Sequence, residues 1–432
     1  MTSIAPFNFS QYAPRDLEII DTTLREGSQT SLLHDHFKYY FSQPDKIEIT
    51  RALIICGIKF IELFAPIVSP RERDDFLAIR AVRDTLITQK GYTFLLAHVR
   101  CHPADIESAI NAGFDGLNLY MGTSNLSQQS SHGKTLDQIV RRTRDLIEDV
   151  RKNHPHLVLR FSGEDAFRTR EADLFRVFDE IVPLVHRIGT PDTVGVATPG
   201  AVVKRVQALR TRYPTLDLEG HFHDDRGFSL VNALEGIKAG MRYLNTTILG
   251  IGERSGITSM TALLFNLHVD REFDRLKGYE LRDSYPINVI LASKLKKLVQ
   301  SKEPVSLTNR THAAGVHQKA VLDDSATYEA HPLDQFGVNE SEILLGPLCG
   351  WNMVYYYLGE IKYYQIDEDT ARKITEVFKS RVYHLDPGDT PGPLLVEIAE
   401  KEFNLKLRDI PEAYRDTVVQ NLDRRPDHTK ES

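Results

Sequence analysis

The sequence predicts an α/β protein, a (β/α)8 TIM barrel followed by a mostly helical C-terminal appendage. Short apolar segments of strand type alternate with helical patterns from about residue 17 to 268, and the alternation stops after residue 270. Such alternation requires parallel strands joined by crossovers, and eight strand-helix units in about 250 residues can close into a barrel. An open doubly wound sheet is the alternative fold.

The expected strands are short and rich in branched apolar and aromatic residues. They cover residues 17–24, 58–64, 92–99, 114–121, 157–162, 188–195, 216–223 and 243–249. Several of the helical segments between them begin at Ser, Thr, Asp or Pro and end at Gly, which is typical of helix termini.

The chain has 432 residues, enough for one large domain and an appendage. We expect five segments. These are a flexible N-terminal arm (1–16), a TIM-barrel catalytic domain (17–275), a linker or lid subdomain that carries His317 and Tyr328 (276–340), a helical C-terminal subdomain (341–420) and a disordered tail (421–432).

Composition argues against several classes of partner. Lys and Arg number 53 against 60 Asp and Glu, a net charge of −7, so we expect no nucleic-acid partner. No apolar run is long enough for a membrane helix, and the start of the chain does not resemble a signal peptide. The three cysteines are far apart and form no CxxC pair, which indicates a reducing compartment. We therefore expect a cytoplasmic protein without membrane partners.

One expected strand carries an unusual polar row. Residues two apart in a strand share a face, so Glu219, His221 and His223 point the same way. Buried polar groups cost about 1–3 kcal/mol each unless they are paired. A metal ion would satisfy such a row, whereas a lone H-x-H pair is more often an ordinary buried or surface pair.

The end of the first expected strand is also polar. Alternation predicts that Asp21, Thr23 and Arg25 share the inward face, with Glu26 beside Arg25 at the end of the strand. Catalytic groups of TIM barrels lie at the C-terminal ends of the strands. We therefore expect Arg25 and Glu26 at the mouth of the barrel.

Two further strands contribute to this end. The same alternation points His98, Arg100, Arg160, Ser162 and Glu164 inward. A carboxylate and two imidazoles leave open metal positions for a chelating 2-oxo acid. A neighbouring arginine could stabilise an alkoxide, and inward His98, Arg160 and Ser162 could hold a second carboxylate. A solvated rim of ion pairs is the alternative interpretation.

Two other motifs are weaker. His34–Asp35–His36 is also an H-x-H, but its aromatic-rich surroundings favour a lid over a metal site. The stretch GIGERSG (250–256) resembles a glycine-rich phosphate loop only loosely.

Nine stretches together resemble the homocitrate synthase branch of the DRE-TIM metallolyase superfamily. They are IIDTTLREGSQ (19–29), LLAHVRCH (95–102), MGTSNLSQQSSHGK (121–134), RFSGEDAFR (160–168), DTVG (192–195), LEGHFHDD (218–225), LGIGERSGIT (249–258), THAAGVHQKAVL (311–322) and ATYEAHPLDQFG (326–337). The resemblance implies a Claisen-type acyltransferase that condenses acetyl-CoA with 2-oxoglutarate.

The resemblance also implies residue roles. It places a divalent cation (Mg, Mn or Zn) on Glu26, His221 and His223. It implies 2-oxoglutarate contacts from Arg25, Gln29, His98, Arg160, Ser162 and Thr193, and a catalytic group of His317 as base with Arg25, Tyr328 and Glu164. It further implies a swapped homodimer in which the segment around His317 covers the partner's barrel.

Other functions stay open at this point. The same condensation could use another 2-oxo acid, as in citramalate-, isopropylmalate- or phosphonomethylmalate-type synthases. A 2-oxoglutarate oxygenase also uses two histidines and a carboxylate, but its all-β scaffold conflicts with the alternation. A non-catalytic paralogue is the remaining alternative.

Overall fold

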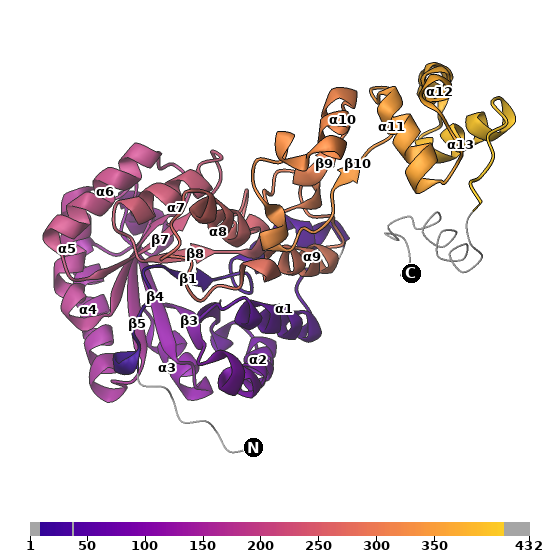
Figure 1. Cartoon of the computed structure of the whole chain (residues 1–432). Coiled ribbons are helices and arrows are strands. Elements are labelled where there is room, and N and C mark those ends of the chain that lie inside the picture. The colour runs from indigo at the N-terminus through magenta and orange to yellow at the C-terminus, as the bar shows by residue number, and fades with distance from the viewer. Residues whose placement is uncertain (1–8, 37–38, 410–432) are drawn as a thin grey trace. The chain divides into compact units, whose positions relative to one another are not determined.

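The computed structural model describes residues 9–36 and 39–409 (Figure 1). Eight parallel strands form a closed barrel in chain order, β1 to β8, which confirms the predicted fold and rejects the open sheet. The strands are β1 (Glu18–Asp21), β2 (Phe60–Phe64), β3 (Phe94–Arg100), β4 (Gly116–Gly122), β5 (Val158–Glu164), β6 (Arg187–Asp192), β7 (Asp217–Phe222) and β8 (Tyr243–Thr246).

Helices follow the strands and surround them (Figure 1). They are α1 (Gln43–Ile55), α2 (Pro70–Lys90), α3 (Pro103–Ala112), α4 (Leu136–Asn153), α5 (Glu171–Ile181), α6 (Pro199–Arg212), α7 (Ser229–Lys238) and α8 (Met260–Val269). Ser42 and Thr135 form capping boxes with Asp45 and Gln138, which satisfies backbone donors at the starts of α1 and α4. In the described part of the chain, none of the helices is long and apolar enough to cross a membrane.

The N-terminal half of the barrel interior is apolar. Buried side chains from five strands fill it: Ile20, Phe60, Phe94, Leu96, Val158 and Tyr243. Phe9 and Tyr12 pack edge-on against Phe60 and Phe94 and close this end. Residues 1–8 of the expected flexible arm lie outside the described residues. Phe9 and Tyr12, which were also expected in that arm, pack against the barrel, and the local sequence pattern does not show this contact.

The inward face of β1 differs from the prediction. Ile20 faces the interior beside Phe60, so Asp21 faces away from it and pairs with Thr23 instead. The prediction that Asp21 and Thr23 point inward is wrong because alternation in β1 has the opposite phase: Thr22 follows Ile20 on the inward side, where its hydroxyl donates to Glu62 at 3.0 Å. The backbone then turns, with the Glu26 amide donating to the Thr22 carbonyl at 2.8 Å. Strand alternation therefore does not extend to Arg25 and Glu26.

The described residues form two compact units. The first comprises the residues up to Ser306 together with Leu333–Val338. It includes α9 (Ser284–Lys294) and Tyr279, whose hydroxyl accepts from Ile19 N at 2.9 Å and donates to Leu17 O at 3.1 Å. Residues 276–306, expected in a linker, thus belong to the barrel unit.

The second unit comprises residues 307–332 and 339–409. It contains β9 (Thr311–His312) and β10 (Glu342–Ile343), which pair in parallel, and the helices α10 (Gly315–Asp323), α11 (Trp351–Tyr356), α12 (Glu368–Arg381) and α13 (Pro391–Lys401). Met353, Leu358, Phe378 and Ile398 lie in its apolar core. The helical appendage is therefore confirmed, and the expected tail (421–432) lies outside the described residues.

Candidate active site

A polar cavity of about 460 Å³ opens at the C-terminal ends of the barrel strands. It is lined by every barrel residue to which the sequence analysis assigns a site role: Arg25, Glu26, Gln29, His98, Arg160, Ser162, Glu164, Thr193, His221 and His223. The barrel brings these residues together from five strands and the turns that follow them. Sequence neighbours alone could not do so.

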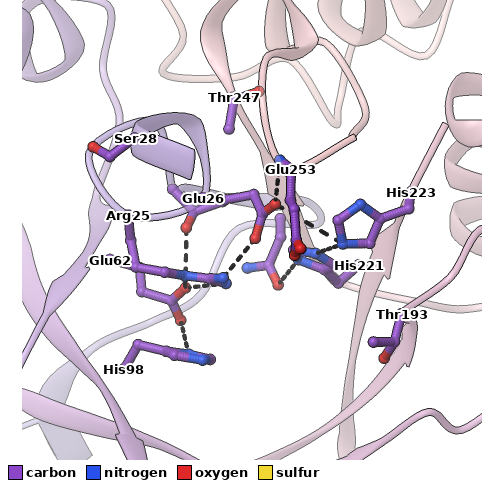
Figure 2. Close-up of polar contacts among 12 residues, drawn as sticks. Arg25, Glu26, Ser28, Glu62, His98, Thr193, His221, His223, Thr247 and Glu253 are labelled. Atoms are coloured by element: carbon purple, nitrogen blue, oxygen red, sulfur yellow. Dashed lines mark hydrogen bonds and ion pairs between the residues drawn. The ribbon is translucent and has the colours of Figure 1, made fainter. Parts of the chain in front are cut away.

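Glu26, His221 and His223 form a compact group at one side of the cavity (Figure 2). One potential ligand atom from each lies within 4.8 Å of the others, and all three residues are buried. The two imidazoles face each other, with Nε2 atoms 3.3 Å apart. Among the residues that the structure describes, this is the only such cluster of His, Cys, Asp or Glu, and it does not include His34.

The two imidazoles of this group are neutral. Burial lowers the pKa of His221 to about 3 and also lowers the pKa of His223. A neutral ring carries a lone pair on one nitrogen, and in the tautomers with both lone pairs on Nε2 the two rings and the carboxylate would attract a cation. The donor set therefore suits a divalent metal ion with further positions open to a substrate.

Glu26 is held from two sides. Arg25 Nη1 donates to its Oε2 at 2.6 Å, and the backbone amide of Glu253 donates to its Oε1 at 3.0 Å. Burial alone would raise the pKa of Glu26, but Arg25, the two histidines and the Glu253 amide together outweigh burial, and the pKa falls to about 2. The carboxylate is thus ionised and fixed in orientation.

The GIGERSG loop has a structural task in this site. Besides the Glu253 amide, it supplies Gly252, where a Cβ would lie only 3.0 Å from Glu26 Oε1. Arg254 pairs with Asp225, with Nε 2.7 Å from Oδ1, and donates to the Thr193 carbonyl at 2.8 Å. The loop therefore holds a candidate metal ligand, which is a role that its resemblance to a phosphate loop did not suggest.

Glu62 is a central residue that the sequence analysis missed. Its fully buried carboxylate accepts from Arg25 Nε at 2.9 Å, from Thr22 Oγ1 at 3.0 Å and from the side-chain amide of Asn118. Burial alone would raise its pKa, but Arg25 and other neighbouring cations hold the pKa well below the usual range. The signal was present in the sequence, because Glu62 is the one charged residue among the apolar residues of 60–64.

Donors without partners gather at the other side of the cavity. Arg160 Nε and Ser162 Oγ are buried and have no hydrogen-bond partner within residues 9–36 and 39–409. His98 stacks on Tyr120 with ring centroids 4.4 Å apart. A Cβ at Gly189 would overlap Ser162 Oγ, so the glycine keeps this space open. Buried donors without acceptors are costly and mark a place for an anionic ligand group.

Arg100 lies at the rim instead of the interior. Its side chain is 64% exposed, and its guanidinium pairs with Asp105 through Nε–Oδ2 at 2.8 Å and Nη2–Oδ1 at 2.9 Å. The residue shares the inward side of β3 with His98, as the alternation predicts. Because β3 ends at Arg100, its long side chain reaches solvent.

Glu164, Thr193 and Gln29 complete the lining. Burial raises the pKa of Glu164, with a further contribution from Asp165, so this carboxyl group retains a proton more readily than an exposed one. The Thr193 hydroxyl oxygen accepts from Asp165 N at 2.9 Å, which leaves its proton free to donate. Gln29 ends the short helix η2 (Gly27–Gln29) and is exposed.

His317 and Tyr328 belong to the second compact unit. Their ring centroids lie 4.0 Å apart, and both side chains are exposed. The neighbouring Glu329 anchors this segment, because it accepts from Arg310 Nε at 2.9 Å and Ser341 Oγ at 2.9 Å. The fold thus places the His317 imidazole against the Tyr328 phenol ring, although the two residues are eleven positions apart in the chain.

Comparisons with known proteins give a consistent result. Residues 16–287 match the HMGL-like family, and residues 305–384 match the homocitrate synthase post-HMGL domain-like family. The chain is 34% identical to a mitochondrial homocitrate synthase of Schizosaccharomyces pombe, over 81% of this chain and 82% of the relative. It is 32% identical to a cytosolic homocitrate synthase isozyme of Saccharomyces cerevisiae, over 84% and 82%.

The fold is also found in solved structures. A hydroxymethylglutaryl-CoA lyase from Pseudomonas aeruginosa superposes with a TM-score of 0.55 at 20% identity, covering 67% of this chain and 96% of that chain. At this level of identity the similarity concerns the fold of the barrel.

The Arg25–Glu62 pair yields a test of stability. Replacing Glu62 with Ala leaves the buried Arg25 guanidinium without its main counter-charge, so we expect a loss of about 3–5 kcal/mol in the free energy of unfolding of the barrel. Glu62→Gln keeps an acceptor and should lose less. The control is Glu180→Ala, which removes an exposed pair with Arg144 and should cost at most about 1 kcal/mol. Equal losses for Glu62→Ala and the control, measured by denaturant unfolding, would contradict the assigned importance of Glu62.

Proposed function

Because this chain belongs to the HMGL-like family, we propose that it condenses acetyl-CoA with 2-oxoglutarate to form homocitrate and CoA. The observation that carries the proposal is the two-sided cavity. One side holds a cluster of metal-ligand type, and the other holds buried donors without partners. A 2-oxo acid with a second carboxylate has complementary groups at its two ends.

We assign the metal ligands to Glu26, His221 and His223. Two neutral imidazoles and one ionised carboxylate within 4.8 Å fit a divalent cation of the Mg, Mn or Zn class. Bound there, such an ion would act as a Lewis acid that polarises a ketone oxygen. The chain's own residues provide the remaining functions.

Substrate binding is assigned to residues on both sides of the cavity. Arg25 lies next to Glu26 and would stabilise negative charge that develops on the ketone oxygen. Thr193 and Gln29 line the same region and can donate to the adjacent carboxylate. Arg160, Ser162 and His98 would bind the distal carboxylate, which supplies the acceptor that Arg160 Nε and Ser162 Oγ lack.

The proposed reaction begins with proton transfer. His317 takes a proton from the methyl group of acetyl-CoA, since an imidazole readily accepts a proton near neutral pH. The resulting enolate carbon attacks the keto carbon and forms the new C–C bond, and the keto oxygen becomes an alkoxide beside Arg25. The alkoxide takes up a proton, for which the raised pKa of Glu164, caused mainly by burial, makes that carboxyl group a suitable donor. Water then hydrolyses the thioester and releases CoA.

We further propose that the active unit is a homodimer in which the segment around His317 acts at the partner's barrel. Two features support this. The His317–Tyr328 pair is exposed on its own compact unit, and symmetric dimers are the commonest oligomers. Tyr328 would orient the imidazole through the ring contact.

A reducing compartment suits the protein, and we propose the cytosol. Its three cysteines are buried free thiols, and burial raises the pKa of each of them.

The metal assignment predicts loss of binding on loss of any ligand. Glu26→Gln and His223→Ala should lose both the bound metal and turnover while far-UV circular dichroism stays unchanged. The control is His34→Ala, which alters the exposed histidine of the other H-x-H motif and should keep both. Metal content by mass spectrometry and thiol release from acetyl-CoA are the measurements. Full activity of either ligand variant after chelator treatment would contradict the assignment.

The proposed site for the distal carboxylate predicts that the enzyme prefers 2-oxo acids with a second carboxylate. Pyruvate lacks a second carboxylate and leaves the Arg160 and Ser162 donors without an acceptor, so its kcat/KM should be at least about 100-fold below that of 2-oxoglutarate. Thiol release measured with a panel of 2-oxo acids tests this. Equal kcat/KM for 2-oxoisovalerate would overturn the assignment and favour an isopropylmalate-type synthase.

The shared active site predicts complementation between two inactive proteins. Glu26→Gln and His317→Ala are mixed in equal amounts under conditions of subunit exchange. Half of the dimers are then mixed, and each mixed dimer has one site with both defects and one with neither. Activity should return to about a quarter of the wild-type level. If mass analysis confirms exchange and no activity returns, His317 does not act at the partner's site.

A further inference from the structure

Asn245 occupies a central position that none of the assigned roles explains. It lies on β8, is fully buried, and its strand pairs with β7 so that Tyr243 lies opposite Glu219. This register brings Asn245 level with His221. The side chain therefore points into the polar half of the barrel, one layer above the apolar Tyr243.

The carbonyl oxygen of Asn245 contacts two functional side chains. It lies 3.1 Å from Nδ1 of His221 and accepts from Nη2 of Arg160 at 3.4 Å. Arginine can only donate, so the amide atom that faces Arg160 must be the oxygen. The contact with Arg160 thus fixes which way the Asn245 amide is turned.

The orientation of the amide in turn sets the tautomer of His221. An oxygen acceptor next to Nδ1 requires that Nδ1 carries the proton, and the neutral ring then has its lone pair on Nε2. Nε2 is the atom that faces His223 Nε2 at 3.3 Å in the candidate metal group. A flipped amide would favour the proton on Nε2, which would block metal binding.

The environment of the amide nitrogen indicates that packing alone does not explain an asparagine at position 245. Asn245 Nδ2 is buried and has no hydrogen-bond partner in the described part of the chain. An unsatisfied buried donor is destabilising, so packing alone would favour an apolar side chain of similar size. Among the described residues, the carbonyl oxygen alone of the two amide atoms forms hydrogen bonds, and both join it to residues of the site.

We propose that Asn245 is a positioning residue that couples the metal ligand His221 to the substrate-binding Arg160. Its one oxygen holds Nδ1–H of His221 and Nη2 of Arg160 together. Displacement of either partner therefore disturbs the other. The inference rests on the proposed function, because it assumes that His221 binds a metal ion and that Arg160 binds the distal carboxylate of a 2-oxo acid.

The experiment measures Co²⁺ binding to the metal-free full-length protein by calorimetry and by the visible absorption of the bound ion. Asn245→Leu removes the unsatisfied donor together with the acceptor, which offsets the cost of leaving His221 Nδ1–H unpaired, so the variant should lose little thermal stability. Its dissociation constant for Co²⁺ should rise by about 10–100-fold. Asn245→Asp retains an acceptor oxygen and should bind Co²⁺ as tightly as the unmodified protein or more tightly.

The control is Thr246→Val. Thr246 is the next residue of β8, is equally buried, and points to the opposite face of the strand. This variant should bind Co²⁺ normally. In steady-state assays, Asn245→Leu should also raise KM for 2-oxoglutarate several-fold and leave KM for acetyl-CoA unchanged.

Each outcome separates the inference from the proposed function. Wild-type Co²⁺ affinity in Asn245→Leu, weak binding in Asn245→Asp, or an equal loss in Thr246→Val would overturn the positioning role. Failure of the unmodified protein to bind Co²⁺ would overturn the metal assignment itself.

Discussion

The placement of Arg25 between two buried carboxylates is the constraint on which the cavity depends. Glu62 binds the Nε and Nη2 side of the guanidinium, and Glu26 binds Nη1. A buried cation requires such compensation, and a carboxylate that must face a metal ion cannot be free to rotate. Glu62 therefore fixes Arg25, Arg25 fixes one oxygen of Glu26, and the Glu253 amide fixes the other. The geometry of the candidate metal group follows from these contacts.

The barrel interior is apolar in its N-terminal half and polar in its C-terminal half. Phe60, Phe94 and Tyr243 fill the N-terminal half, where Phe9 and Tyr12 close the end. Above them, Glu219 lies between Arg160 and Arg187, at 2.5 and 2.6 Å from the two guanidinium groups. This ionic layer holds Arg160 from below and leaves its Nε without a hydrogen-bond partner among the described residues. The apolar half supplies stability, and the polar half retains unsatisfied groups that a substrate can use.

The loop at residues 250–256 further fixes the orientation of site residues at the ends of the strands. The backbone of the 250–256 loop reaches Glu26, and its Arg254 ties the ends of β6 and β7 together through Thr193 and Asp225. In the proposed role, Asn245 acts in a similar way from a strand instead of a loop, because its one oxygen orients both the proposed metal ligand His221 and the proposed substrate-binding Arg160. Backbone amides and side-chain amides are suited to this task because their directions are set by the fold.

The sequence alone determined the barrel and the residues of its polar rim. The alternation of apolar and polar residues in strands and the residue types at helix ends are local patterns that can be recognised without the tertiary structure. His221 and His223 share a face for that reason. The predicted phase of alternation was wrong in β1, where Ile20 instead of Asp21 faces the interior. Alternation also could not show that Glu62 and Asn245 contact Arg25 and His221. Those contacts join strands that are 37 and 24 residues apart in the chain, and only closure of the barrel brings them within hydrogen-bond distance.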